Sequence, residues 1–173
     1  MKKLIVFAIA ILGFTAVSFG QVNTSAATSA TVITPISILK TTDLSFGTLA
    51  VSPTVAGTLV LSTAGVRDVT GGGGGVTLPA VTGTVSAAEF TVSGLAGSIY
   101  TIGLPNSITL TGDVSGTMTV NGFNSNPTVA AGGVIGGGGS QTVKVGATLN
   151  VSAGQAAGLY SNAAGLVVTV NYN

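Results

Sequence analysis

Strict alternation of apolar and polar side chains is the feature that most restricts how this chain can fold. The clearest run is Gln141–Val151. Its apolar members share one parity and its polar members share the other: Val143, Val145, Ala147, Leu149 and Val151 against Thr142, Lys144, Thr148 and Asn150. Successive side chains of a β-strand point to opposite faces, so the run predicts one half-buried strand, or two strands joined at Gly146.

The same alternation of apolar and polar side chains recurs along the chain. The C-terminal run Leu166–Tyr172 alternates in the same way, and shorter runs bounded by Gly, Pro or Asn predict further strands. These are Leu44–Phe46, Thr58–Ser62, Glu89–Ser93, Ser98–Leu104, Ser107–Leu110 and Thr117–Val120. No long stretch after the first twenty residues has the 3.6-residue period of a helix. Many short strands at this spacing predict an all-β sandwich or barrel.

The composition argues against catalysis. The 173 residues include five basic and four acidic ones, with no histidine and no cysteine. Nucleophilic, acid–base and metal chemistry depend mainly on these residue types. We therefore expect no enzyme, no catalytic residue, no cofactor and no metal site.

The few charged residues have simple structural interpretations. Glu89 has no second carboxylate or histidine near it in the sequence, so we expect a solvated strand end. Asp113 alone cannot supply the six to eight oxygens that calcium takes. We expect the Asp43 side chain to fix the turn before Leu44 through a hydrogen bond to the backbone, and Arg67 and Asp68 to form a solvated hairpin tip.

Two glycine tracts interrupt the strands, at Gly71–Gly75 and Gly136–Gly139. Neither is followed by the Lys-Ser/Thr pair and helix that a phosphate-binding loop needs. Flexible hairpin loops are the simpler interpretation. We predict that residues 70–76 and 131–140 are mobile and have few buried contacts.

The first twenty residues have the pattern of a signal peptide. Lys2 and Lys3 precede the apolar stretch Leu4–Ala16, and small residues follow at the two positions that a signal peptidase reads. We expect cleavage before Gln21 and export to the periplasm, the cell surface or the medium. The apolar stretch is shorter than the roughly 20 residues that span a bilayer, so no membrane span is expected after cleavage.

Residues 21–173 are enough for one domain, which must be stabilised by sheet packing because it has no cysteine. They contain three basic and four acidic residues, a net charge of −1. The basic stripe that nucleic acid would require is missing. Charge normally keeps soluble monomers apart, so a surface this neutral favours self-association.

The segment Ala26–Ile38, directly after the predicted signal, also alternates. One parity carries Ala26, Ala30, Val32, Ile36 and Ile38, with Thr28 and Thr34 as exceptions. Pro35 lies on the other parity and lacks an amide hydrogen, which places such a strand at a sheet edge or breaks it there. The strand can pair within its own sandwich, or it can add to an exposed edge of a neighbour.

Three blocks of the chain resemble a known family. They are Ala30–Ile38 with Thr41–Gly47, then Ser86–Val92 with Tyr100–Pro105, then Gly154–Tyr160 with Val168–Tyr172. In this order they resemble the bacterial secreted family called domain of unknown function 4402. The resemblance covers nearly the whole chain after the signal, and it implies no functional residues because that family has no assigned activity.

The same landmarks are more distantly similar to spore-coat-U-type and archaic chaperone–usher pilins. Leu44–Gly47 stands where these pilins have a Leu-x-Phe-Gly turn, and Gly158–Tyr160 where they have a Gly-x-Tyr turn. The similarity implies an incomplete immunoglobulin-like sandwich whose missing strand is supplied by a chaperone and then by the next subunit. The pilins carry a cysteine near the end of the first strand, where this chain has Pro35–Ser37 and no cysteine.

Two functions follow from these features. In the first, the protein is a fimbria-like subunit of a cell-surface polymer, and residues 21–39 form a donor strand that lies in a groove of the next subunit. Ala30, Val32, Ile36 and Ile38 would then fill pockets of that groove. The partners would be further copies or other surface subunits, with a periplasmic chaperone and an usher. In the second, the protein is a self-contained secreted adhesin or binding module whose first strand pairs internally.

Overall fold

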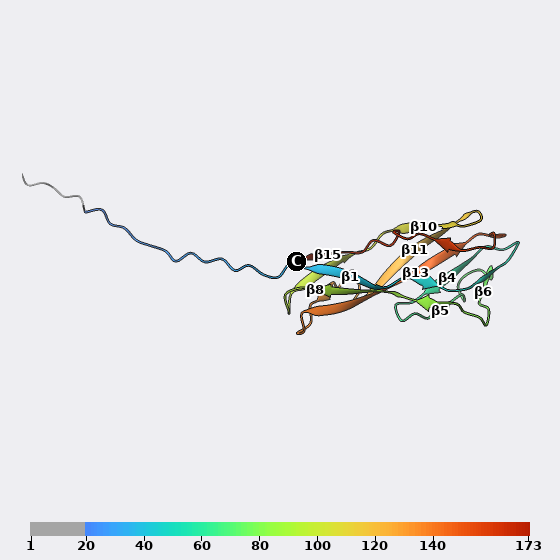
Figure 1. The fold of residues 1–173 in the computed structure, drawn as a ribbon, viewed down its shortest axis with the longest axis horizontal. Helices are drawn as coiled ribbons and strands as arrows, with labels where there is room; N and C mark the ends of the chain where they lie inside the picture. Colours follow the sequence, from blue (N-terminus) through green and yellow to red (C-terminus); the bar gives the residue numbers. More distant parts are fainter. Residues whose placement is uncertain (1–19) are drawn as a thin grey trace, which may run out of the picture. The chain divides into compact units, whose positions relative to one another are not determined.

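The computed structural model describes residues 20–173, so the predicted signal peptide lies outside the described residues except for Gly20. The chain divides into two units, one ending at Val32 and one spanning Ile33–Asn173. The described part of the first unit, residues 20–32, contains no helix and no strand, and all of its residues are exposed. The second unit is built from strands (Figure 1).

The main sheet has eight strands, and every strand pair in it is antiparallel. Its central path is β1 (Ser37–Thr42), β8 (Ala88–Ser93), β13 (Ser140–Val151), β11 (Thr117–Asn126), β10 (Ser107–Gly112) and β14 (Tyr160–Ser161). Beside the second half of β13 lie β4 (Gly57–Leu61) and then β5 (Arg67–Asp68).

Smaller antiparallel groups accompany the main sheet. One has the order β12 (Gly133–Val134), β9 (Ile99–Gly103) and β15 (Thr169–Tyr172). The others are the pair β2 (Ser45–Phe46) with β7 (Val85–Ser86), and the pair β3 (Ala50–Val51) with β6 (Val76–Thr77). Residues 20–173 contain no helix, so the all-β, antiparallel sandwich expected from the sequence is confirmed.

Strand β13 connects the two halves of the domain. Its first half pairs with β8 and its second half with β4, while β11 runs along its other side. It is one strand through Gly146, where a Cβ would collide with the carbonyl oxygen of Leu61. The glycine therefore lets the end of β4 approach β13. Valines and leucines of β13 are buried on one face, as the alternation predicts.

Two hydrophobic clusters form the core. The first includes Phe46, Leu59, Leu61, Val76, Met118, Val120, Ala147, Leu149 and Val151. The second includes Ala88, Phe90, Val92, Tyr100, Ile102, Ile135, Val143, Val145 and Val168. Each cluster thus takes side chains from the main sheet and from the smaller groups that face it, which is the arrangement of a sandwich.

All eight strands predicted from short runs and alternation correspond to observed strands. The C-terminal one is shorter than predicted, because β15 begins only at Thr169, although burial already alternates from Leu166. The strands that the sequence did not indicate are β3, β5, β6, β7, β12 and β14. Each has two residues, and a period of two cannot be recognised in so short a segment.

The prediction of a mobile loop at residues 70–76 is wrong. Gly72 and Gly75 are buried, and a Cβ at either would collide with the backbone of residues 55–58. The amide of Thr58 donates to the carbonyl of Gly72 at 3.1 Å. This glycine tract is packed because only residues without side chains allow two backbones to lie so close.

The second predicted loop, residues 131–140, is only partly a loop. Gly133 lies in β12, and a Cβ there would collide with the ring of Tyr100. Ile135 is buried in the core, so the prediction of few buried contacts is wrong for this part. In contrast, Gly137 and Gly138 are exposed and have open space where a side chain would be.

The predicted strand Ala26–Ile38 is also wrong for most of its length. The first strand begins at Ser37, and residues 26–36 belong to no strand. Ile36 and Ile38 pack against the second core cluster of their own domain. Pro35 stands just before this point, where its missing amide hydrogen and fixed φ make it a natural boundary of the ladder.

The acidic side chains form pairs or hold loops. Glu89 forms an ion pair with Lys144 across β8 and β13, with an N–O distance of 2.6 Å. The carboxylate of Asp43 pairs with Lys40, whereas its backbone carbonyl accepts a hydrogen bond from Ser86 Oγ at 2.7 Å. The predicted hydrogen bond from the Asp43 side chain to the turn backbone is therefore wrong, because this carboxylate pairs with Lys40 instead.

Candidate strand-acceptor groove

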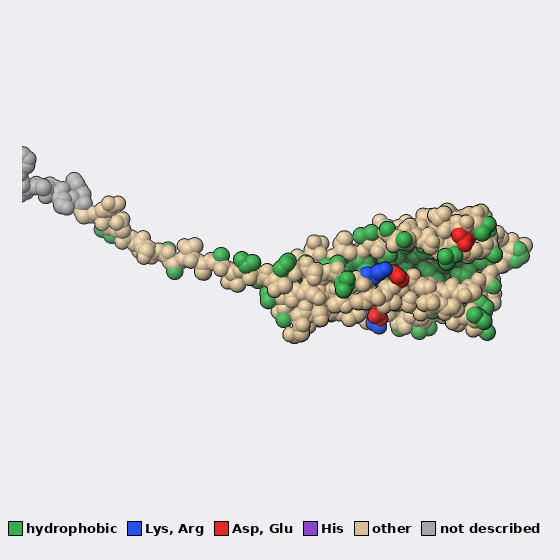
Figure 2. Space-filling model, in the orientation of Figure 1, with side chains coloured by type: hydrophobic (Ala, Val, Ile, Leu, Met, Phe, Trp, Pro, Cys, Tyr) green, Lys and Arg blue, Asp and Glu red, His purple; other side chains and the backbone are tan. Residues whose placement is uncertain are grey.

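A long, partly apolar groove opens into the domain, with a volume of about 1100 Å³. In Figure 2 it is the hollow lined with hydrophobic side chains between two rims of mostly polar atoms. One rim is formed by residues 40–51 and the other by residues 155–166, and the main sheet forms the floor.

The floor follows from the alternation of the main-sheet strands. Side chains of one parity point inward from four neighbouring strands. They are Phe90 of β8, Ile108 and Leu110 of β10, Met118 and Val120 of β11, and Leu149 of β13. Ile108 and Leu110 are only partly buried, so the floor still exposes apolar surface near β10.

The first rim is paired on one side only. Strands β2 and β3 pair with β7 and β6, and between them the amide of Thr48 donates to the carbonyl of Thr82 at 2.7 Å. Within residues 20–173, the amides of Gly47 and Leu49 donate to no backbone carbonyl. A trans peptide directs its N–H opposite to the preceding C=O, and the carbonyls of Phe46 and Thr48 accept hydrogen bonds from Arg67 of β5. The amides of Gly47 and Leu49 therefore point away from β5. The rim is therefore an open sheet edge.

Arg67 of β5 braces this rim from the other side. Its guanidinium donates to the carbonyls of Phe46, at 3.2 Å, and of Thr48, at 2.7 Å. These carbonyls thus point toward β5, opposite to the amides of Gly47 and Leu49. Arg67 is partly buried and bridges two sheets, so the prediction of a solvated hairpin tip is wrong for this residue.

The second rim is held by side-chain hydrogen bonds. The hydroxyl of Tyr160 shares its one hydrogen between the carbonyls of Ala156, at 2.8 Å, and Ser115, at 3.0 Å, and accepts from Gln155 Nε2 at 2.9 Å. The carboxylate of Asp113 accepts from the amide of Leu159 at 2.9 Å. Asp113 therefore positions this rim.

The groove has almost no charge. Among the described residues, Lys40 and Asp43 are the charged ones that line it, and they pair with each other at its edge. Both side chains are more than half exposed. A neutral, extended and partly apolar segment fits such a lining better than a charged ligand does, because the groove offers a charged group no partner.

The four residues predicted to mediate assembly fall into two groups. Ala30 and Val32 belong to the first unit, and Val32 is 97% exposed. Ile36 and Ile38 are partly buried against their own core and do not share the exposure of the other two. The alternation indicated the inward faces of the floor strands, whereas an open groove was implied only by the resemblance to pilins, and no residue pattern indicated where it would lie.

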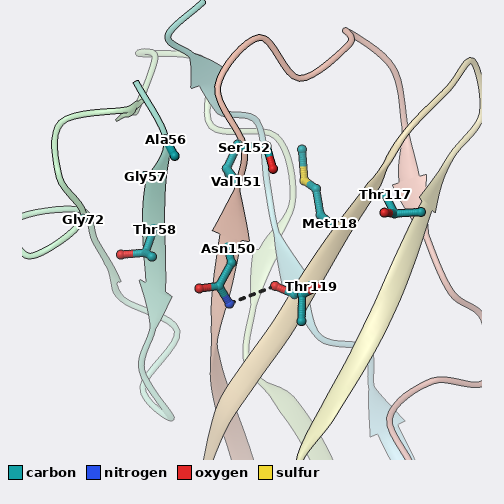
Figure 3. A pocket seen from close by; sticks show the side chains of 10 residues that line it. All are labelled: Ala56, Gly57, Thr58, Gly72, Thr117, Met118, Thr119, Asn150, Val151 and Ser152. Carbon is teal, nitrogen blue, oxygen red and sulfur yellow. Dashed lines mark hydrogen bonds between the residues drawn. The ribbon is translucent and has the colours of Figure 1, made fainter. Parts of the chain in front are cut away.

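A second, shallower hollow of about 460 Å³ lies on the other side of the main sheet (Figure 3). Thr58, Asn150 and Thr119 form a row across β4, β13 and β11. The Asn150 side chain donates to the carbonyl of Thr119 at 3.1 Å and to the side chain of Asn121 at 3.0 Å. This surface is neutral and rich in hydroxyl and amide groups.

No group of three His, Cys, Asp or Glu side chains that could hold a metal ion exists within residues 20–173. That part of the chain also contains no helix that is long and apolar enough to cross a membrane.

The fold and the groove together define a β-sandwich domain with an open sheet edge over an apolar floor. Residues 36–172 match the family described as domain of unknown function (DUF4402), and the chain belongs to this family. No curated protein and no solved structure matches the chain. The family match begins at Ile36, so the exposed residues 20–35 lie outside the matched part.

Proposed function

We propose that this protein is an exported, non-enzymatic structural subunit of a fimbria-like cell-surface polymer that assembles by strand exchange. The observation that supports this most is the open groove, where an apolar floor and an unpaired backbone edge occur together. An added strand would satisfy both, because it brings main-chain hydrogen bonds and apolar side chains at once.

Residues 21–35 are suited to be the donor. They carry no charged residue, all of them are exposed, and they belong to no strand. Residues 21–32 contain as many residues as the rim 40–51, so as an extended strand they would span it. Val22 and Val32 are the largest apolar side chains on the parity that also carries Ala26 and Ala30.

Energetics favour filling the groove. Burying a Val, Leu or Ile side chain fully contributes roughly 1.5–3 kcal/mol. Val32 of the donor and the half-buried Leu44, Leu49 and Leu110 of the acceptor would gain part of this on strand addition. Head-to-tail donation does not close on itself, so it produces a filament.

The pilin-like elements of the proposal rest on the resemblance in sequence. An apolar groove that stays empty after export exposes a surface that promotes aggregation. A periplasmic chaperone that covers the groove, and an usher that exchanges it for the next subunit, would solve this problem. The predicted signal peptide supplies the route of export.

A second candidate is a secreted binding module, favoured by the hydroxyl-rich row of Thr58, Asn150 and Thr119 on the outer face. Neutral glycans are the ligand class that such a surface suits, since it has no charge to offer. Screening the purified protein on a glycan array tests it. Binding that is lost in the Asn150→Ala variant would support the module.

The polymer is tested by comparing the chain from Gln21 with a chain from Ile36. Light scattering after size-exclusion chromatography should detect oligomers that grow with concentration only for the longer chain. Electron microscopy of those oligomers should then reveal filaments. If both chains remain monomeric at every concentration and after refolding, the polymer is excluded.

A further inference from the structure

We propose that this chain fills the groove of a second copy and is prevented from filling its own by a clamp at the base of the donor segment. The clamp consists of the Tyr172 hydroxyl and the backbone of Thr34, with Pro35 next to it. This inference rests on the proposed strand exchange, and it explains why exchange would occur between molecules.

Tyr172 connects the C-terminal strand of the domain to the segment just before its first strand. Its hydroxyl donates to the carbonyl of Thr34 at 2.8 Å and accepts from the amide of Leu95 at 2.7 Å. Its backbone belongs to β15, where it pairs with Tyr100 of β9. A Cβ at Gly94 would collide with its hydroxyl, so the ring is held closely on that side too.

The clamp lies where β1 begins and β15 ends, and these two points are at the same end of the domain (Figure 1). The rim of the groove starts at Lys40 and runs away from this end along residues 40–51. To enter its own groove, the chain before Thr34 would therefore have to reverse direction within a few residues of the clamp.

The sequence at this point opposes such a reversal. Tight hairpin turns need residues with positive φ, usually Gly, Asn or Asp, and residues 30–42 contain none of these. Pro35 fixes its own φ and biases Thr34 toward an extended conformation. Ile36 then packs against the core. The chain thus passes the clamp extended, which leaves a neighbouring molecule as the acceptor.

The absence of natural cysteine makes the inference directly testable. Val32→Cys in the donor segment is combined with Leu49→Cys on the first rim, and in a second variant with Ala163→Cys on the other rim. After mild oxidation of the chain from Gln21, any disulfide reports the donor segment in a groove. Non-reducing electrophoresis separates intermolecular ladders from monomers closed by an internal disulfide.

The expected result is an intermolecular ladder with little internal product. Adding Tyr172→Phe should raise the ratio of internal to intermolecular disulfide by about two- to tenfold, the range that loss of one hydrogen bond gives. Thr101→Ala is the matched control, because it removes a hydrogen bond from Thr101 Oγ1 to Asn171 and leaves Thr34 untouched. Melting temperatures of both variants are measured, so that a general loss of stability is recognised.

The other outcomes distinguish a failure of the clamp from a failure of the proposed strand exchange. A ladder that Tyr172→Phe leaves unchanged overturns the clamp and keeps the strand exchange. Internal disulfide alone in the parent overturns donation to a second copy, although the groove still binds the segment. If neither pair of cysteines forms a disulfide, the segment does not enter a groove, and the proposed function fails.

Discussion

At the scale of single residues, the glycines of one tract differ sharply in what surrounds them. Gly75 is buried against the backbone of Val55 and Ala56, whereas Gly71 is exposed and has open space at its Cβ position. Neither has a positive φ, so an alanine is not excluded by backbone conformation at either position. The two positions therefore test close packing alone.

We expect Gly75→Ala to lower the free energy of unfolding by roughly 1–3 kcal/mol, because the added methyl group overpacks the site. Gly71→Ala should change it by about 0.5 kcal/mol or less. Urea denaturation of both variants measures the difference. If both variants lost the same free energy of unfolding, the first glycine tract would be a loose loop and not a packed one.

Tyr100 is the residue whose titration should matter at high pH. It is fully buried, its hydroxyl donates to Gln141 Oε1 at 2.7 Å, and burial raises its pKa. The unfolded state loses this proton near the ordinary value of about 10, whereas the folded state retains it to higher pH. Once the pH exceeds about 10, the folded state binds more protons than the unfolded state does. The free energy of unfolding therefore falls as the pH rises toward the higher pKa of the folded state.

The Tyr100→Phe variant should consequently lose less stability between about pH 8 and pH 11 than the parent does. Each protein is compared with its own value at the lower pH, since the variant also lacks the hydrogen bond to Gln141. Urea denaturation across this range is the measurement. If the free energies of unfolding of the two proteins fell in parallel with pH, Tyr100 would not be the group that lowers stability at high pH.

At the scale of elements, the brace between β5 and the first rim is the contact that shapes the groove. Replacing Arg67 by Met keeps most of the side-chain stem and removes both hydrogen bonds to the carbonyls of Phe46 and Thr48. We expect a loss of roughly 1.5–3 kcal/mol, since these bonds come from a charged donor. Hydrogen exchange should accelerate along residues 44–51.

Lys144→Met is the control for Arg67→Met. Its ion pair with Glu89 is surface-exposed and should contribute only about 0–1 kcal/mol. The rim should keep its hydrogen-exchange protection in this variant. If both substitutions have equal effects on residues 44–51, Arg67 does not brace the rim.

The donor segment can be tested as a separate element. A chain that starts at Ile36 should melt at a lower temperature or less cooperatively than the chain from Gln21, and a peptide of residues 21–35 should raise its melting temperature by mass action. The boundary is residue 35 because Ile36 and Ile38 belong to the core of their own domain.

The alternation of side chains predicts which peptides should stabilise the shortened chain. A peptide with Val32→Asp should not stabilise the shortened chain, because it would bury an unpaired charge in the groove. A peptide with Thr31→Asp should still do so, since residue 31 faces the other way. Thermal melting with each peptide is the measurement. Equal stabilisation by both would contradict an inward-facing Val32.

At the scale of the whole molecule, the proposed strand exchange gives each copy one donor and one acceptor, and these can be disabled separately. Val32→Asp should block donation, and Leu49→Asp should block acceptance by placing a charge on the rim. Either variant alone should remain monomeric. Mixed together, they should stop at a dimer, because each supplies the one part that the other lacks.

Light scattering of the mixture measures this, and circular dichroism melting checks that both variants are folded. Thr31→Asp is the control and should polymerise like the parent. Oligomers larger than a dimer in the mixture would mean that assembly uses another surface. No association at all, with both variants folded, would mean that the groove does not accept the strand.

The sequence was most informative where strands are long. The alternation of Gln141–Val151 determined both the existence of β13 and its buried face, because a period of two over eleven residues has few other interpretations. It was misleading where a segment alternates without a partner, as in Ala26–Ile36. Alternation describes what a strand would bury, and it does not show that another strand is there to pair with it.

The sequence by itself therefore determined the all-β class, the parity of the floor side chains and the absence of charge from residues 21–35. Only the tertiary structure decided that the layer above β10 and β11 leaves a gap, that Gly72 and Gly75 are packed, and that Tyr172 holds Thr34. These features depend on contacts between residues far apart in the chain. Local periodicity contains no information about such contacts, because they arise only when the two layers come together.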